Sequence, residues 1–191
     1  MAIEFELKYR ATAEDLEKID KNLQTPATVY RMETTYYDTP SRSLSRRHIT
    51  LRRRMENDVS VCTLKAPADQ GRAEFELNCA RIEDALPELC KLSGIPELPE
   101  LLAEGIEPVC GARFTRRARL QALENAQVEI ALDQGVLLGG GRELPFCEVE
   151  VELKRGTVAA VVGYTLGMAV AYGLEPEPKS KFKRALELAG E

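Results

Sequence analysis

The sequence predicts an α+β domain built on an antiparallel sheet of roughly eight strands with flanking helices. Two observations support this fold class: apolar and polar residues alternate in several short segments, and helical patterns interrupt those segments. The alternation is strict in Ile3–Arg10, where apolar and charged residues take turns, which is typical of a half-buried strand. A minority of helices around so many strands favours a sheet that is closed, or nearly closed, as a barrel.

The other strands are predicted from the same period of two or from a richness in strand-forming residues. Asn57-Asp58 indicates a hairpin turn between two of them, and Gly139–Gly141 indicates a loop before the last. The expected strands are Val29–Tyr37, Ile49–Met55, Val59–Lys65, Arg72–Cys79, Phe114–Leu123, Val128–Asp133 and Cys147–Lys154.

Helices are expected where a capping residue precedes a helical pattern. Thr12 caps a helix to about Leu23, and Thr157 caps a longer one that ends at Gly173. Ser180 can start a final basic helix after two prolines. Two short helices are expected at Ile82–Leu92 and Leu98–Glu104.

Length and composition narrow the class of protein. A chain of 191 residues is expected to form a single domain, 1–191, and its net charge of −5 argues against generic nucleic-acid binding. The five cysteines are scattered and form no CxxC pair, which favours reduced thiols over disulfides or a zinc site. The N-terminus is charged from residue 4 onward, and the longest apolar stretch, Val158–Ala171, is too short to span a bilayer. We therefore expect a soluble, cytoplasmic protein with no membrane or nucleic-acid partner, either a monomer or a homodimer.

The polar faces of the predicted strands are sorted by the sign of their charge. Glu148, Glu150 and Glu152 share one face of the last strand, and Arg52 and Arg54 share a face of another. Residues two apart on a strand lie about 7 Å from each other, so like charges repel unless an opposite charge lies between them. Rows of carboxylates attract hard cations, and rows of arginine attract phosphate. The pattern predicts a site for a metal–polyphosphate complex; a solvated face with incidental ion pairs is the alternative.

Several motifs occur in an order that resembles a known family. ExExK stands at Glu4–Lys8, and LRRR, TLK and RAEFE follow at Leu51–Arg54, Thr63–Lys65 and Arg72–Glu76. YYDT, EIALDQG, EVEVEL and SKFKRAL complete the series at Tyr36–Thr39, Glu129–Gly135, Glu148–Leu153 and Ser180–Leu186. The ordered series is similar to the CYTH family, also called the triphosphate tunnel metalloenzymes, and most of all to its bacterial inorganic triphosphatases.

The resemblance implies an eight-stranded antiparallel β-barrel, or tunnel, that hydrolyses inorganic triphosphate with Mg²⁺ or Mn²⁺. It places metal at Glu4, Glu6, Glu148 and Glu150, which with Lys8 form the expected catalytic group. The expected triphosphate ligands are Lys8, Arg52, Arg54, Lys65, Arg116 and Lys181. The expected tunnel-lining residues are Arg72, Glu74, Glu76, Glu129, Asp133 and Glu152.

Two questions stay open at this level. If the face of the basic strand that carries Phe114 points inward, Arg116 binds phosphate; if the other face does, Arg117 and Arg119 take that role. A thiamine or nucleoside triphosphatase, a class IV adenylate cyclase and a non-catalytic polyphosphate or nucleotide sensor are alternative functions on the same scaffold. The cyclase is disfavoured because Tyr36-Tyr37-Asp38 stands where that group carries an HF-type motif.

Overall fold

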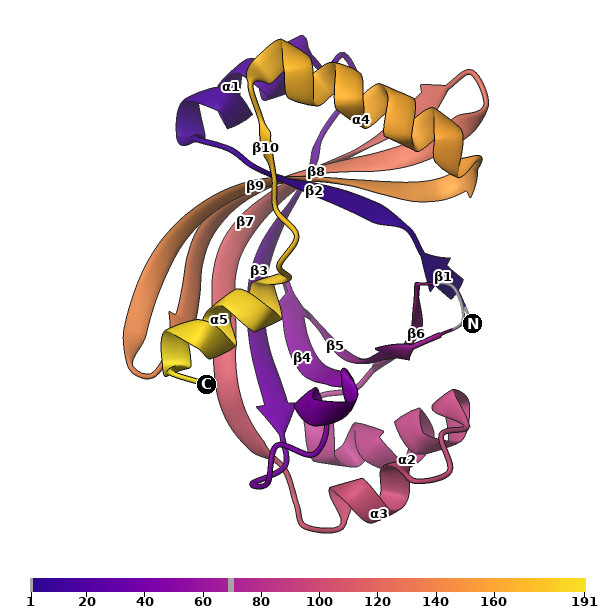
Figure 1. The fold of residues 1–191 in the computed structure, drawn as a ribbon, viewed down its shortest axis with the longest axis vertical. Coiled ribbons are helices and arrows are strands. Elements are labelled where there is room, and N and C mark those ends of the chain that lie inside the picture. Colours follow the sequence, from indigo (N-terminus) through magenta and orange to yellow (C-terminus); the bar gives the residue numbers. More distant parts are fainter. Residues whose placement is uncertain (1, 69–70) are drawn as a thin grey trace.

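The computed structural model of the protein describes residues 2–68 and 71–191, with side chains from residue 5 onward in these ranges. Ten strand segments form one curved sheet in the order β1-β6-β5-β4-β3-β7-β8-β9-β2-β10, and all neighbours are antiparallel (Figure 1). The segments are β1 (Ala2–Glu4), β2 (Glu6–Arg10), β3 (Thr28–Asp38), β4 (Thr50–Glu56), β5 (Val59–Pro67), β6 (Arg72–Asn78), β7 (Glu107–Leu123), β8 (Ala126–Gly139), β9 (Arg142–Gly156) and β10 (Glu175–Pro176).

The first predicted strand is interrupted at Phe5 because its two parts pair with different neighbours. Before this residue β1 pairs with β6, and after it β2 pairs with β9. The chain at Phe5 therefore connects two distant parts of the sheet, although the hydrogen-bonded order itself still has ends at β1 and β10. With β1 and β2 counted as one strand, β3 to β9 complete the eight strands expected, and the α+β fold class is confirmed.

Three strands extend well beyond their predicted bounds. β8 and β9 continue to the hairpin at Gly140-Gly141, and β7 begins at Glu107 rather than at Phe114. Helix α5 (Lys181–Ala189) packs on this part of the sheet from the concave side (Figure 1), where its Ala185 joins Ala112, Leu137 and Phe146 in one apolar cluster. Gly139 is required there, since an added Cβ would lie 2.2 Å from the carbonyl oxygen of Ala185.

The other helices pack on the outer side of the sheet. α1 (Ala13–Asn22) and α4 (Val158–Tyr172) lie together over β2, β8 and β9, whereas α2 (Ile82–Ser93) packs on β5 and β6 (Figure 1). The short helix α3 (Leu98–Leu102) follows α2, and the 3-10 turn η1 (Ser45–Arg47) precedes β4. Thr12 caps α1 through a capping box with Asp15, as its sequence position predicts. In the described residues, no helix is both long and apolar enough to cross a membrane.

Three apolar clusters hold these layers together. Leu16 and Ile19 of α1 pack with Ile130, Leu132 and other outward side chains of β8 and β9. A second cluster joins the outer faces of β4 and β5 to α2, and a third joins β3, β7, β8 and β9 to α5 on the concave side. Because the outward side chains form the first two cores, the alternate side chains of the same strands point into the curve of the sheet. Those inward positions carry the charge.

Candidate active site

A cavity of about 420 Å³ lies inside the curve of the sheet, and charged side chains form most of its wall. Its basic lining residues are Lys8, Arg52, Arg54, Lys65, Arg72, Arg116, Lys154 and Lys181. Its acidic lining residues are Glu6, Glu56, Glu74, Glu76, Glu129, Glu150 and Glu152. The two signs are interleaved, so a ligand in this cavity would meet cations and carboxylates at once.

The sequence-predicted site residues therefore gather largely in one place, although they come from eight different elements. Glu148 and Asp133 lie behind the cavity wall and are fully buried. The side chain of Glu4 falls outside the described part of the chain; its backbone pairs with Arg72 in β6.

The open question about the basic strand β7 has a structural answer. Arg116 lines the cavity, as do residues of the neighbouring strands that face it. Arg117 and Arg119 point to the outer side, where both pair with Asp20 of α1 at 3.6 and 2.5 Å. The side of β7 that carries Phe114 and Arg116 is thus the inward one.

Arg52 and Arg54 of β4 form a basic wall with Lys65 of β5. Glu74 of β6 accepts contacts from Arg52 at 3.3 Å and from Lys65 at 3.1 Å, so these two cations share one carboxylate. Glu76 lies 3.6 Å from Arg52. Arg52 and Lys65 therefore share their nearest carboxylate.

Arg54 is the most buried member of the basic wall. Its Nε donates to Thr34 Oγ1 at 3.0 Å, and Glu56 lies 3.7 Å from its guanidinium. Burial, together with repulsion from Arg52 and Arg116, lowers the pKa of Arg54 to about 10. A guanidinium whose pKa falls in this way is poorly compensated, and an anion placed between these arginines would restore the balance.

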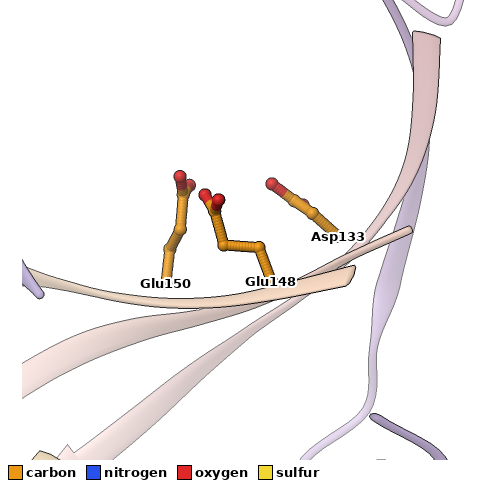
Figure 2. A group of neighbouring side chains, drawn as sticks. All are labelled: Asp133, Glu148 and Glu150. Atoms are coloured by element: carbon orange, nitrogen blue, oxygen red, sulfur yellow. The ribbon is translucent and has the colours of Figure 1, made fainter. Parts of the chain in front are cut away.

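The opposite wall contains three carboxylates, Asp133, Glu148 and Glu150, whose oxygen atoms lie within 4.8 Å of one another (Figure 2). The ammonium of Lys181, at the start of α5, reaches all three, at 2.9, 2.6 and 2.7 Å respectively. Arg116 pairs with Asp133 at 2.7 Å and also with Glu150, and Arg184 pairs with Glu148. We refer to these six side chains as the acid cluster.

Burial and pairing act in opposite directions within the acid cluster. Burial raises the pKa of Glu148 to about 7, against the attraction of Lys181. For Glu150 burial also disfavours the charge, but Lys181 and Arg116 outweigh it and hold the pKa well below its usual range. Burial likewise opposes the charge of Lys181, yet the three carboxylates raise its pKa. The cluster is therefore neutralised internally, by three cations for three carboxylates.

Two functional positions were not predicted from the sequence. Lys154 lines the cavity and pairs with Glu152 at 2.8 Å and with Glu129 at 3.9 Å. It follows Glu152 by two residues, so the alternation of β9 already assigned it to the inward face. Arg184 lies one helical turn after Lys181, and the spacing of three residues along α5 is the signal that could have pointed to it.

Comparison with known proteins places this site in a family. The sequence model of the CYTH domain family matches residues 2–186, and the chain therefore belongs to this family. The inorganic triphosphatase of Haemophilus influenzae is 29% identical over 155 residues, which cover 78% of this chain and 44% of that protein. The chain thus spans less than half the length of this curated relative.

Solved structures agree on the fold at low sequence identity. HpAC1 from Hippeastrum, described as a candidate adenylyl cyclase with a dominant triphosphatase activity, superimposes with a TM-score of 0.70. It is 18% identical, and the match covers 97% of this chain and 96% of that one. The PH1819 protein from Pyrococcus horikoshii gives a TM-score of 0.65 at 22% identity, covering 97% and 99% of the two chains.

Proposed function

We propose that this chain hydrolyses inorganic triphosphate to diphosphate and phosphate inside the charged cavity. The observation that carries the proposal is the cluster of Arg52, Arg54 and Arg116, in which mutual repulsion and burial leave Arg54 poorly compensated. A linear triphosphate supplies the missing negative charge along its whole length. Planar guanidinium groups suit its oxygens because each can donate two hydrogen bonds at once.

The donor set also fits a divalent metal ion, but not at the centre of the acid cluster. Lys181 already lies between Asp133, Glu148 and Glu150, where such an ion would have to bind. The carboxylates that face the cavity, Glu6 and Glu150 above all, offer the hard oxygen ligands that Mg²⁺ and Mn²⁺ prefer. Roles for Glu4 and Glu148 as ligands stay predictions. When bound, the ion would neutralise charge on the phosphate oxygens.

The chain's own residues would contribute mainly positioning and charge. Phosphoryl transfer needs little covalent help from a protein, so arginine and lysine side chains around the terminal phosphate can stabilise its transition state. A water molecule adds to the terminal phosphorus, the bond to the bridging oxygen breaks, and diphosphate leaves. A carboxylate of the cavity wall orients the water and takes up its proton. Lys8, Lys65 and Lys181 would hold the remaining oxygens.

Three related functions compete with this one. The same phosphate-binding wall would serve a nucleoside triphosphatase, a thiamine triphosphatase or an adenylate cyclase. We keep the cyclase as an alternative because the similar Hippeastrum protein is named as one. A sensor that binds polyphosphate or a nucleotide without turnover would need the arginines only. The cavity-facing carboxylates favour catalysis, because they would repel the ligand of a pure anion sensor.

The test is phosphate release from inorganic triphosphate, ATP and thiamine triphosphate, each with Mg²⁺, Mn²⁺ or EDTA. We expect metal-dependent turnover of inorganic triphosphate well above that of the other two. Cyclic AMP is measured in parallel with ATP as substrate. Tight binding of triphosphate without release of phosphate would replace the hydrolase proposal by the sensor.

A further inference from the structure

Helix α4 presents an apolar outer face on the side away from the sheet. Its 15 residues contain no charged side chain, and its buried residues, Val161, Thr165 and Met168, face the sheet. On the opposite side Leu166 and Val170 are 56% and 84% exposed. A surface helix normally carries polar residues there. In Figure 1 α4 crosses the top of the molecule beside α1, with no other part of the described chain beyond it.

The same face contains both protrusions and notches. Gly163 and Gly167 are exposed, and a Cβ added to either would meet no atom within 4 Å. They border a groove of about 440 Å³ between α1 and α4, whose lining includes Ile19, Leu23 and Met168. Leu166 and Val170 stand next to these glycines on the exposed side. A partner with large apolar side chains and small residues in the same alternation would fit this surface closely.

We propose that this face binds a second copy of the chain, with the two α4 helices antiparallel across a two-fold axis. If the two-fold axis passes between Leu166 and Gly167, a residue of one α4 helix lies opposite the residue of the other α4 helix whose number brings the sum of the two to 333. Leu166 of one copy then faces Gly167 of the other, and Val170 faces Gly163. Each protrusion meets a notch, which is the self-complementarity that a two-fold interface requires.

Charge at the two ends of α4 supports the same arrangement. Arg155, exposed, precedes the helix on the outer side of β9, because its neighbour Lys154 points into the cavity. Glu175, also exposed, follows the helix in β10. In the antiparallel pair the start of each helix lies beside the end of its partner, so the basic residue before one helix and the acidic residue after the other come to the same end of the interface. The helix dipoles add to this attraction.

A lipid surface fits these features less well. Membrane-binding helices carry a basic rim that meets anionic lipid. Beside α4, the exposed face of α1 pairs Glu14 with Lys18 and Glu17 with Lys21, and the whole chain has a net charge of −5. A rim of balanced ion pairs suits contact with another protein copy. One helix per copy gives an interface below the usual area of about 800 Å² per partner, so we expect a dimer that forms only at high protein concentration.

Sedimentation velocity across a range from about 1 μM to 1 mM tests the proposal on the full chain. Wild type should pass from monomer to dimer, and Val170→Glu should stay monomeric throughout. Gly163→Leu fills a notch without placing a charge, and it should also stay monomeric while keeping its thermal stability. Val59→Glu, at an apolar residue 48% exposed in the β4–β5 hairpin, is the matched control and should dimerise like wild type.

A charge exchange tests the antiparallel register separately. Arg155→Glu and Glu175→Arg should each weaken the dimer several-fold, and the double variant should regain most of the loss. Wild type that stays monomeric at 1 mM, or a Val170→Glu dimer of undiminished affinity, would overturn the proposal. Binding of monomeric wild type to anionic vesicles would assign the face to a membrane instead. Phosphate release plays no part in these readouts, so the hydrolase proposal stands or fails independently.

Discussion

The two charged walls of the cavity differ in how their charges are compensated. In the acid cluster, Lys181 contacts three carboxylates within 2.9 Å, and the charges cancel inside the wall. In the basic wall, Arg54 has its nearest carboxylate at 3.7 Å and a pKa lowered to about 10 by burial and by its arginine neighbours. If the proposed function is right, the buried ion pairs of the acid cluster contribute most to stability, whereas Arg54 in the basic wall gains most from a bound anion. We therefore expect substitutions of the carboxylates of the acid cluster to affect stability, and substitutions of the arginines that face the cavity, Arg116 included, to affect ligand binding.

The largest expected effect is on stability, in the acid cluster. Glu150→Ala leaves Lys181 and Arg116 with one fewer buried carboxylate, and removing one partner of a buried ion pair costs about 3–5 kcal/mol. Urea unfolding in EDTA measures this change without interference from metal. Glu14→Ala removes the partner of Lys18 on the surface of α1, where the two side chains are 75% and 56% exposed, and should cost at most about 1 kcal/mol. Equal losses for the two variants would mean that the acid cluster contributes no special stability.

The next effect is on turnover, in the basic wall. Arg54→Ala should lower phosphate release from triphosphate by about 10²–10³-fold, the usual loss when one preorganised donor to a transition state is removed. Its unfolding free energy should stay constant or rise, because a poorly compensated buried charge is lost. Arg53→Ala is the matched control, because Arg53 immediately precedes Arg54 in β4 and lies on the other face of the strand. There its Nε donates to Ser60 Oγ at 2.9 Å. Strong destabilisation by Arg54→Ala would contradict the contrast between the walls.

Binding of the ligand itself should stabilise the protein through Arg116 but not through Arg117. At a concentration of triphosphate 100 times its dissociation constant, the folded state gains about 2.7 kcal/mol. Thermal unfolding with and without triphosphate, in EDTA to prevent turnover, measures this gain. Arg117→Ala should retain it and Arg116→Ala should lose most of it, although the two residues are adjacent in β7. The reverse result would assign phosphate binding to the outer face.

Much of this arrangement followed from the alternation of residues in the sequence. Period two placed Glu150 and Glu152 on one face of a strand and Arg52 and Arg54 on one face of another, and the fold follows the predicted elements. Alternation alone did not decide which face of β7 points inward, because both faces carry arginine: Arg116 lies on one, and Arg117 and Arg119 lie on the other. The packing of α1 decides the matter, since Asp20 lies on the outer side. Such contacts between distant segments are not encoded in local periodicity.

The composition of the acid cluster was also beyond sequence reasoning. In the sequence, Glu148 and Glu150 look like equivalent members of one acidic row. In the structure they differ, because of the register between β9 and β8 and because of the position of α5. Glu148 becomes fully buried and meets Arg184, whereas Glu150 also faces the cavity and meets Arg116. The sorted charges predicted that cations were needed, but not that Lys181 would be the one at the centre of the cluster.

The smallest expected effect, a change in the pH dependence of stability, distinguishes these two glutamates. Burial raises the pKa of Glu148 to about 7, above its value of about 4.3 in an unfolded chain, so the folded state retains a proton that the unfolded state has lost. The stability from that proton is fully present below about pH 4 and disappears as the pH rises through 7. Wild type should therefore lose about 2–3 kcal/mol relative to Glu148→Gln between pH 5 and pH 8.

Glu150→Gln is the matched control two residues away. The pKa of Glu150 lies below the ordinary range in the folded protein, so this carboxylate is ionised in both states from pH 5 to pH 8 and contributes no slope of its own. Because Glu150 helps to raise the pKa of Glu148, the Glu150→Gln variant should keep the slope of stability against pH in a weaker form. Urea unfolding of the three proteins at four pH values across this interval gives the slopes. If the slope of unfolding free energy against pH disappears in Glu150→Gln and persists in Glu148→Gln, Glu150 is the carboxylate with the raised pKa and Glu148 is not. This result would place the carboxylate with the raised pKa on the cavity side of the cluster, and the buried carboxylate would then be the one that its cations keep ionised.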